Sequence, residues 1–158
     1  MVRLALYQPE IPQNTGTLLR LAACMGVNVD IVRPCNFALS DRQLKRAGMD
    51  YMDKTDVLFH DTWKDYQIFS HSCSPTRRLV LLDTKATIPY IDFRFSSNDC
   101  LVLGSEGEGV PSSVYEDTDY QVLIPMHPSF RSLNVAISAA MVLGEALRQT
   151  ESFFPCKQ

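Results

Sequence analysis

The stretch Cys100-Leu101-Val102-Leu103-Gly104-Ser105-Glu106-Gly107-Glu108-Gly109 decides the fold of this chain. Its first four residues are all apolar, which predicts a strand buried on both faces, as in a parallel sheet covered by helices. Glycines follow directly, at the point where that strand ends. Glycine lets a ligand approach the backbone closely, and ligands of open α/β sheets bind at the carboxyl ends of strands. The stretch therefore indicates an α/β fold with a ligand site in this loop.

Strands and helices alternate along the rest of the chain. Short apolar runs predict strands at 2–7, 27–32, 57–59, 79–82, 100–103 and 122–124. A helix is predicted at 15–25, with Asn14 as its N-cap and Gly26 as its stop. Further helices are predicted at 62–71, near 111–115 and at about 133–149. A short one is predicted to begin after a cap at Ser40-Asp41 and to end near Gly48. This order predicts a mostly parallel sheet flanked by helices.

The last predicted helix is apolar on almost all sides over residues 135–143. A helix of this kind is buried on more than one side. A subunit interface and a place at the centre of the core fit the pattern equally well.

The composition predicts one globular domain spanning residues 1–158. Hydrophobic residues make up 46% of the chain and charged residues 21%, which is ordinary for a globular protein and excludes a disordered chain or a coiled coil. The formal net charge is −3, unlike that of a protein that binds nucleic acid through bulk charge. Any contact with nucleic acid must therefore come from local basic patches or from a second subunit.

The five cysteines are odd in number and form no C-x-x-C pair. This pattern fits reduced thiols better than a disulfide framework or a zinc site. The three histidines show no metal-ligand spacing, and the first apolar stretch is too short for a signal peptide. No apolar run is long enough to span a membrane. We therefore expect a cytoplasmic protein with no metal and no membrane contact.

The glycine-rich loop at 104–109 differs from the usual phosphate-binding loops. Its spacing matches neither G-x-G-x-x-G nor a Walker loop, it holds no lysine, and Glu106 and Glu108 would repel a phosphate. Carboxylates accept hydrogen bonds from ribose hydroxyls or amines and favour a cationic ligand. S-adenosylmethionine carries a ribose, an ammonium and a sulfonium. The alternative is a tight surface turn with solvated glutamates.

Two further loops stand at the start of predicted helices. The first is Asn14-Thr15-Gly16-Thr17-Leu18-Leu19-Arg20, where Arg20 has apolar neighbours in the sequence and needs a partner or a ligand unless it reaches the surface. The second runs from Ile124 to Asn134, and Ser132 or Asn134 is expected to cap the helix that follows. Exposed backbone N–H groups at such a helix start are able to meet a ligand.

The three loops, in this order, resemble the motifs of the SPOUT class of RNA methyltransferases. Asn14-x-Gly16-x-x-x-Arg20 resembles the first motif, Gly104-x-Glu106-x-x-Gly109 the second, and Ile124-Pro125-Met126 with Arg131-Ser132-Leu133-Asn134 the third. Within the class, the chain is most similar to the small tRNA wobble-position 2′-O-methyltransferases. Their other signatures resemble residues 7–16 and 46–51, and the resemblance covers about residues 2–149.

The resemblance implies an α/β fold with a deep trefoil knot near the C-terminus, a rare exception among protein chains. It also implies a homodimer with the last helix in the interface, and S-adenosylmethionine as the cofactor. The implied substrate is the ribose 2′-hydroxyl of nucleotide 34, a cytidine or a carboxymethylaminomethyl-type uridine, in the anticodon stem-loop of leucine tRNA. The positions that match the family's cofactor-binding residues are Leu82, Gly104, Glu106, Ile124, Ser132 and Leu133.

The resemblance offers Arg20 as the catalytic residue. A guanidinium with a pKa above ~12 is a poor base, so we expect Arg20 to stabilise the developing alkoxide or to grip the adjacent phosphate. The residues expected to bind the RNA substrate are Asn14, Arg42, Lys45, Arg46, Arg131 and Asn134, with Arg77 and Arg78 adding phosphate contacts.

Three other functions remain open on the sequence alone. The first is a 2′-O-methyltransferase of the same class that acts on another tRNA position or on ribosomal RNA. The second is a non-catalytic module that binds S-adenosylmethionine. The third is a small nicotinamide-dependent oxidoreductase, against which the missing G-x-G-x-x-G motif argues.

Overall fold

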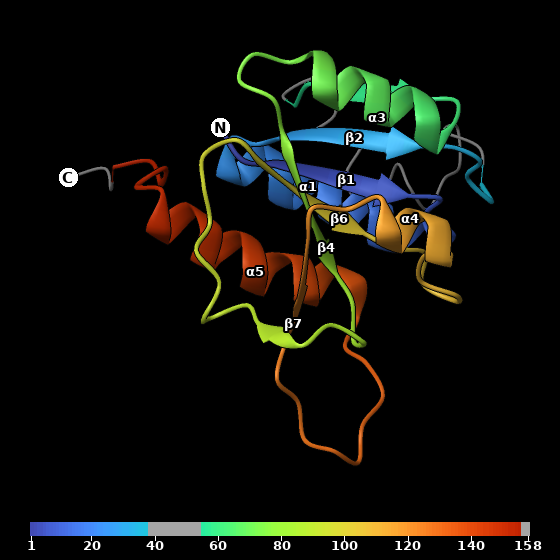
Figure 1. Cartoon of the computed structure of the whole chain (residues 1–158), viewed down its shortest axis with the longest axis vertical. Coiled ribbons are helices and arrows are strands. Elements are labelled where there is room, and N and C mark those ends of the chain that lie inside the picture. Colours follow the sequence, from blue (N-terminus) through green and yellow to red (C-terminus); the bar gives the residue numbers. More distant parts are fainter. Residues whose placement is uncertain (38–54, 156–158) are drawn as a thin grey trace.

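A computed structural model describes residues 1–37 and 55–155 of the chain (Figure 1). Its centre is a parallel sheet of seven strands in the order β3-β2-β1-β6-β4-β7-β5. The strands are β1 (Arg3–Tyr7), β2 (Asn28–Val32), β3 (Val57–His60), β4 (Arg78–Leu82), β5 (Ile88–Pro89), β6 (Asp99–Leu103) and β7 (Tyr120–Leu123). The α/β fold with a mostly parallel sheet is confirmed. The two-residue strand β5 was not predicted, because a run this short has no periodicity.

Helices cover both faces of this sheet (Figure 1). The described helices are α1 (Pro12–Met25), α3 (Trp63–Ser72), α4 (Ser112–Glu116) and α5 (Val135–Gln149). Side chains alternate along β1, so Leu4 and Leu6 join the core cluster of α1 and α5, while Ala5 and Tyr7 join that of α3 and α4. Burial on both faces explains why the strands are apolar without alternation.

The start of α1 differs from the sequence-based prediction. The helix begins at Pro12 with Ile11 as its N-cap, three residues before the predicted cap at Asn14. Proline suits the first turn because its missing N–H would have no helical partner there and its φ is already helical. The Asn14 side chain is therefore available for contacts outside the helix. The predicted stop at Gly26 is confirmed, with φ at 65°.

The last helix begins two residues later than predicted, and Asn134 is its cap. The Asn134 side chain accepts hydrogen bonds from the backbone N–H groups of Ala136 and Ile137. Ala139, Val142 and Ala146 pack into the core, whereas Ile137 and Met141 are 54% and 38% exposed. The helix is thus a core helix on one side that keeps an apolar surface on the other.

The predicted short basic helix after Ser40-Asp41 lies outside the described residues. Within the described part of the chain, no helix is both long and apolar enough to cross a membrane.

Candidate functional site

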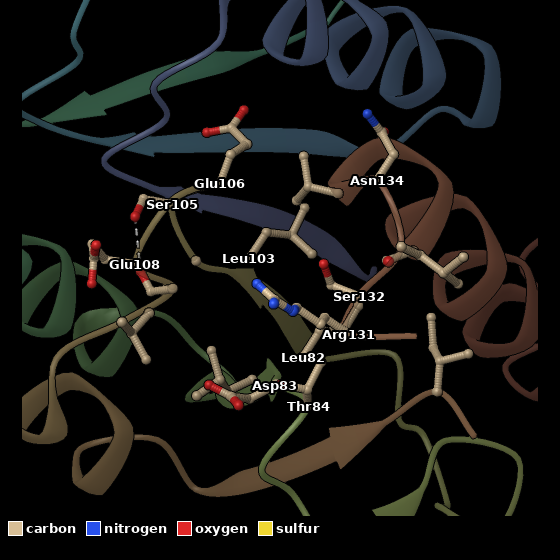
Figure 2. A pocket seen from close by; sticks show the side chains of 18 of the residues that line it. Leu82, Asp83, Thr84, Leu103, Ser105, Glu106, Glu108, Arg131, Ser132 and Asn134 are labelled. Carbon is tan, nitrogen blue, oxygen red and sulfur yellow. Dashed lines mark hydrogen bonds between the residues drawn. The ribbon is translucent and has the colours of Figure 1, made fainter. Parts of the chain in front are cut away.

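One cavity of about 620 Å³ lies at the carboxyl ends of β4, β6 and β7 (Figure 2). Its volume is typical of sites for small ligands and cofactors. Four segments line it: the start of α1, residues 82–85 after β4, residues 104–110 after β6, and the loop between β7 and α5. The three loops singled out in the sequence therefore meet at one site, although they are separated by up to 120 residues.

The glycine loop is folded into a tight hairpin rather than left open. Ser105 and Gly109 exchange backbone hydrogen bonds of 2.9 and 3.0 Å. A Cβ placed on Gly104 would lie 2.7 Å from the Gly109 carbonyl carbon, and Gly109 has a φ of +70°. Both positions thus require glycine, the first for close approach of the backbone and the second for a left-handed conformation.

The Glu106 carboxylate joins the glycine loop to the start of α1. Its Oε2 accepts a hydrogen bond from the Glu10 backbone N–H at 2.8 Å, and its Oε1 accepts one from Asn14 Nδ2 at 3.1 Å. In Figure 2, Glu106 and Asn134 both lie along the upper edge of the cavity. Glu106 was predicted to accept from a ribose or an amine. In the structure both of its oxygens already accept from the protein, so any ligand uses the lone pairs that remain.

Asn14 continues this connection to the third loop. Its Oδ1 accepts a hydrogen bond of 3.0 Å from Asn134 Nδ2, while Asn134 Oδ1 caps α5. A continuous path of side-chain hydrogen bonds thus runs from Glu106 through Asn14 to Asn134. Each of the three loops contributes one member of the path, which fixes their relative positions.

The walls of the cavity combine apolar side chains with a polar rim. Leu82, Leu103, Ile124 and Leu133 are among the apolar lining residues. The polar rim includes the segment Asp83-Thr84-Lys85, whose turn is closed by a 2.7 Å hydrogen bond from the Lys85 N–H to Asp83 Oδ1. Sequence reasoning missed this segment. The available signal was its place directly after a predicted strand of a parallel sheet.

Most of the predicted site residues that the structure describes line this cavity. All six predicted cofactor-binding positions do so: Leu82, Gly104, Glu106, Ile124, Ser132 and Leu133. The predicted substrate-binding residues Asn14, Arg131 and Asn134 line it as well. Arg42, Lys45 and Arg46 lie outside the described residues.

The two arginines proposed to meet the substrate differ in position. Figure 2 shows the Arg131 side chain reaching into the cavity. Arg20 is not among the described residues that line it, and its side chain is exposed on α1. Arg20 thus reaches the surface, which was one of the two alternatives, because Leu18 and Leu19 point into the core on another side of the helix. Its proposed catalytic role stays a prediction.

Arg78, which was predicted to contact RNA, pairs with a carboxylate of the protein itself. Arg78 stands at the amino end of β4 and forms two hydrogen bonds with Asp99, of 2.6 Å from Nε and 2.9 Å from Nη2. These bonds to Asp99 raise the pKa of the Arg78 guanidinium. Arg78 therefore pairs with Asp99 at the end of the strand opposite the cavity, and its contact with RNA stays a prediction.

Within residues 1–37 and 55–155, no group of three or more His, Cys, Asp or Glu side chains is placed to hold a metal ion. The groups with strongly displaced pKa values also lie away from the cavity. Burial raises the pKa of Cys100 to about 12 and that of Tyr66 well above its usual value, and the Tyr66 hydroxyl donates to Cys100 Sγ.

Residues 1–144 match the family model described as the SpoU rRNA Methylase family. The chain belongs to this family. Among its relatives in the SpoU family, a tRNA (cytidine(34)-2′-O)-methyltransferase of Beijerinckia indica is 53% identical over 146 residues, which cover 92% of this chain and 90% of that protein.

Solved structures of SpoU-type proteins share the fold. One, described as giving structural insights into the 2-OH methylation of C/U34 on tRNA, is 36% identical, has a TM-score of 0.86, and is matched over 94% of this chain and 95% of that chain. The AviRb methyltransferase of Streptomyces viridochromogenes, in complex with the cofactor AdoMet, has a TM-score of 0.86 at 24% identity over 94% of this chain and 60% of that one. The second likeness concerns the fold alone.

Proposed function

We propose that this chain is an S-adenosylmethionine-dependent methyltransferase that acts on the ribose 2′-hydroxyl of wobble nucleotide 34 of tRNA. The observation that carries the proposal is the single cavity in which the three predicted loops meet. The 53% identity to a tRNA (cytidine(34)-2′-O)-methyltransferase over nine-tenths of both chains supports the choice of substrate. We further propose leucine tRNA, with a cytidine or a carboxymethylaminomethyl-type uridine at that position, as the substrate.

The cavity fits a methyl donor of this kind. The absent side chain at Gly104 lets the Gly109 backbone pack into the space a Cβ would need, which closes the hairpin that forms one wall of the cavity. Leu82, Ile124 and Leu133 offer apolar walls for an adenine, and Ser132 offers a hydroxyl. When bound, the donor supplies a methyl group already activated by its positive sulfonium.

The protein's own share of the reaction is to position the ribose and to handle the proton of its hydroxyl. A positioned reacting pair accounts for much of the rate in reactions of this kind. We propose that Arg20 stabilises the alkoxide or holds the adjacent phosphate, and that Arg131 holds RNA at the cavity mouth. Arg42, Lys45 and Arg46 are proposed to add phosphate contacts. The deep trefoil knot also belongs to this proposal, together with a single catalytic domain.

The exposed side of α5 supports the proposed homodimer. Ile137, Met141 and Gly144 are spaced so that they share one side of the helix. Ile137 is 54% exposed, and a Cβ placed on Gly144 meets no atom within 4 Å. Figure 1 shows α1, which carries Arg20, near α5. A partner that covers α5 would therefore also approach the surface of α1.

The proposal is tested by incubating the protein with labelled S-adenosylmethionine and bulk tRNA, followed by nucleoside mapping. The expected product is a 2′-O-methylated nucleotide at position 34. Label in ribosomal RNA or at another tRNA position would show that the substrate differs from the one proposed. Donor binding without transfer to any RNA would contradict the enzymatic function.

The role of Arg20 is tested separately. Arg20→Ala is expected to abolish turnover while calorimetry still detects donor binding. Arg94→Ala, which removes another exposed arginine, serves as the matched control and is expected to keep turnover. Near-normal turnover of Arg20→Ala would remove Arg20 from the mechanism.

A further inference from the structure

A short segment between β1 and α1 contacts the glycine loop from outside the cavity. The chain leaves β1 at Gln8, which has a φ of 45° in the left-handed region, and its backbone N–H donates to the Val32 carbonyl at 2.9 Å. Left-handed backbone is uncommon for residues other than glycine and is retained where the surrounding structure requires it. This turn brings Glu10 to the glycine loop.

Glu10 and the glycine loop hold each other through two reciprocal hydrogen bonds. The Glu10 backbone N–H donates to Glu106 Oε2 at 2.8 Å, and the Gly107 N–H donates to Glu10 Oε2 at 2.9 Å. A Cβ placed on Gly107 would lie 3.0 Å from the same Glu10 oxygen. The Gly107 backbone is therefore in close contact with the Glu10 carboxylate, which leaves little space for a side chain at position 107.

Glu10 does not itself line the cavity, whereas Gly107 does. A hydrogen bond from a backbone N–H to a carboxylate is about twice as strong as one between neutral groups. The Glu10 carboxylate is thus the acceptor that fixes the loop at Gly107, and the cavity wall depends on that loop.

We propose that Glu10 is a positioning residue for the methyl donor. It holds the backbone of the glycine loop in the conformation that accepts the donor, and acts through Gly107 rather than by touching the ligand. This inference rests on the proposed function, because it takes S-adenosylmethionine as the ligand of the cavity.

The test compares Glu10→Ala with Glu10→Gln. Glu10→Ala removes the acceptor, and the Kd for S-adenosylmethionine in calorimetry is expected to rise about tenfold or more, the range for loss of a hydrogen bond to a charged group. KM for the donor should rise in parallel, while kcat at saturating donor stays within about threefold, because the loop is restored once the donor is bound. Glu10→Gln keeps an acceptor oxygen and should recover most of the donor affinity.

Glu116→Ala is the matched control. Glu116 is an exposed glutamate at the end of α4 and is not among the residues that line the cavity. Its donor affinity should equal that of the wild type. Amide hydrogen exchange supplies a readout without ligand, since Gly107 should exchange faster in Glu10→Ala than in the wild type or in Glu10→Gln.

A double-mutant cycle with Gly107→Ala sharpens the assignment. Gly107→Ala alone presses its methyl group against the Glu10 carboxylate and is expected to weaken donor binding. Removing that carboxylate relieves the clash, so the Glu10→Ala/Gly107→Ala double variant should lose less affinity than the two single losses combined. Strictly additive losses would contradict direct contact between the two residues as the cause.

Two negative results have separate meanings. Unchanged donor affinity and Gly107 exchange in Glu10→Ala would overturn the role of Glu10 and leave the proposed function intact. A wild-type protein that binds no S-adenosylmethionine would overturn both. An equal loss of affinity in Glu10→Ala and Glu10→Gln would also overturn the inference, because it would show that the acceptor oxygen is not what matters.

Discussion

The two halves of the sheet differ in where most of their polar groups lie. In the half formed by β1, β2 and β3, charged groups lie inside the protein: Asp30 is fully buried and accepts two hydrogen bonds from Arg3, of 2.7 and 3.1 Å, and lies 3.0 Å from His60 Nε2. In the half formed by β6, β4 and β7, one buried carboxylate, Asp99, pairs with Arg78 at the amino ends of the strands, while the polar groups beyond the carboxyl ends line an open cavity.

This contrast separates stability from function. The buried cluster around Asp30 is satisfied within the protein and lies outside the cavity lining. The cavity instead combines apolar walls with polar groups on the loops. Displaced pKa values point to functional sites in many enzymes. Here the strong shifts belong to Tyr66 and Cys100, which are buried in packing, and to Glu145, which pairs with Arg148. None of the three lines the cavity, so a search by pKa alone would miss the site.

The largest effect is expected in the buried half. Asp30→Ala leaves the Arg3 guanidinium buried without its carboxylate partner, and breaking a buried pair in this way costs about 3–5 kcal/mol. Urea denaturation should show this loss in the free energy of unfolding. Donor affinity of the folded fraction should stay unchanged. A variant as stable as the wild type would contradict the stabilising role of the cluster around Asp30.

The next effect is expected in the glycine loop. Gly104→Ala places a methyl group within 2.7 Å of the Gly109 backbone, so the hairpin must shift. Calorimetry should show donor affinity reduced about tenfold or more, equivalent to about 1.4 kcal/mol or more. Glu116→Ala, which changes an exposed residue outside the cavity lining, is again the control. Normal donor binding by Gly104→Ala would show that the conformation of the glycine loop does not matter for the donor site.

A smaller effect distinguishes the two roles of Asn134. Asn134→Ala removes both the cap of α5 and the hydrogen bond to Asn14, and loss of a cap costs about 1 kcal/mol in the free energy of unfolding. Asn134→Ser keeps a capping hydroxyl but cannot donate to Asn14 as the amide does. Thermal melts should show Asn134→Ser near the wild type, while its donor affinity should fall as in Asn134→Ala. Equal donor affinity in Asn134→Ser and wild type would show that the connection to Asn14 does not shape the cavity.

The smallest effect concerns alkaline pH. Burial raises the pKa of Cys100 from 9.0 to about 12 and also raises that of Tyr66. Above about pH 9 the unfolded chain therefore releases protons that the folded chain retains, so stability falls as pH rises. The melting temperature should decline from pH 9 to 11, and less steeply in Tyr66→Phe, which lacks one of the two groups. An identical slope in both proteins would assign the decline to other groups.

The sequence was informative where local chemistry decides the structure. Continuous apolar runs predicted strands such as β4 and β6, and Gly26 predicted the end of α1. The start of α1 was misplaced because Asn14 has the chemistry of a cap, yet the structure uses its side chain between Glu106 and Asn134. A contact between residues about 90 and 120 positions apart leaves no local signal.

The cavity was predictable in its parts but not in its connections. All six positions predicted to bind the cofactor line the cavity. The hydrogen bonds between Glu10 and the glycine loop were not predicted, because they depend on how the turn at Gln8 is oriented. The exposure of Arg20 also could not be read from its apolar sequence neighbours, because neighbours in a helix point in different directions.

Hydrogen exchange with and without S-adenosylmethionine tests the central claim most directly. If the four segments that line the cavity form one donor site, the ligand should slow exchange together at the start of α1 and in residues 82–85, 104–110 and 126–135, and leave β2 and β3 unchanged. Slowing confined to one of these loops, or centred on the half of the sheet around Asp30, would contradict a shared donor site.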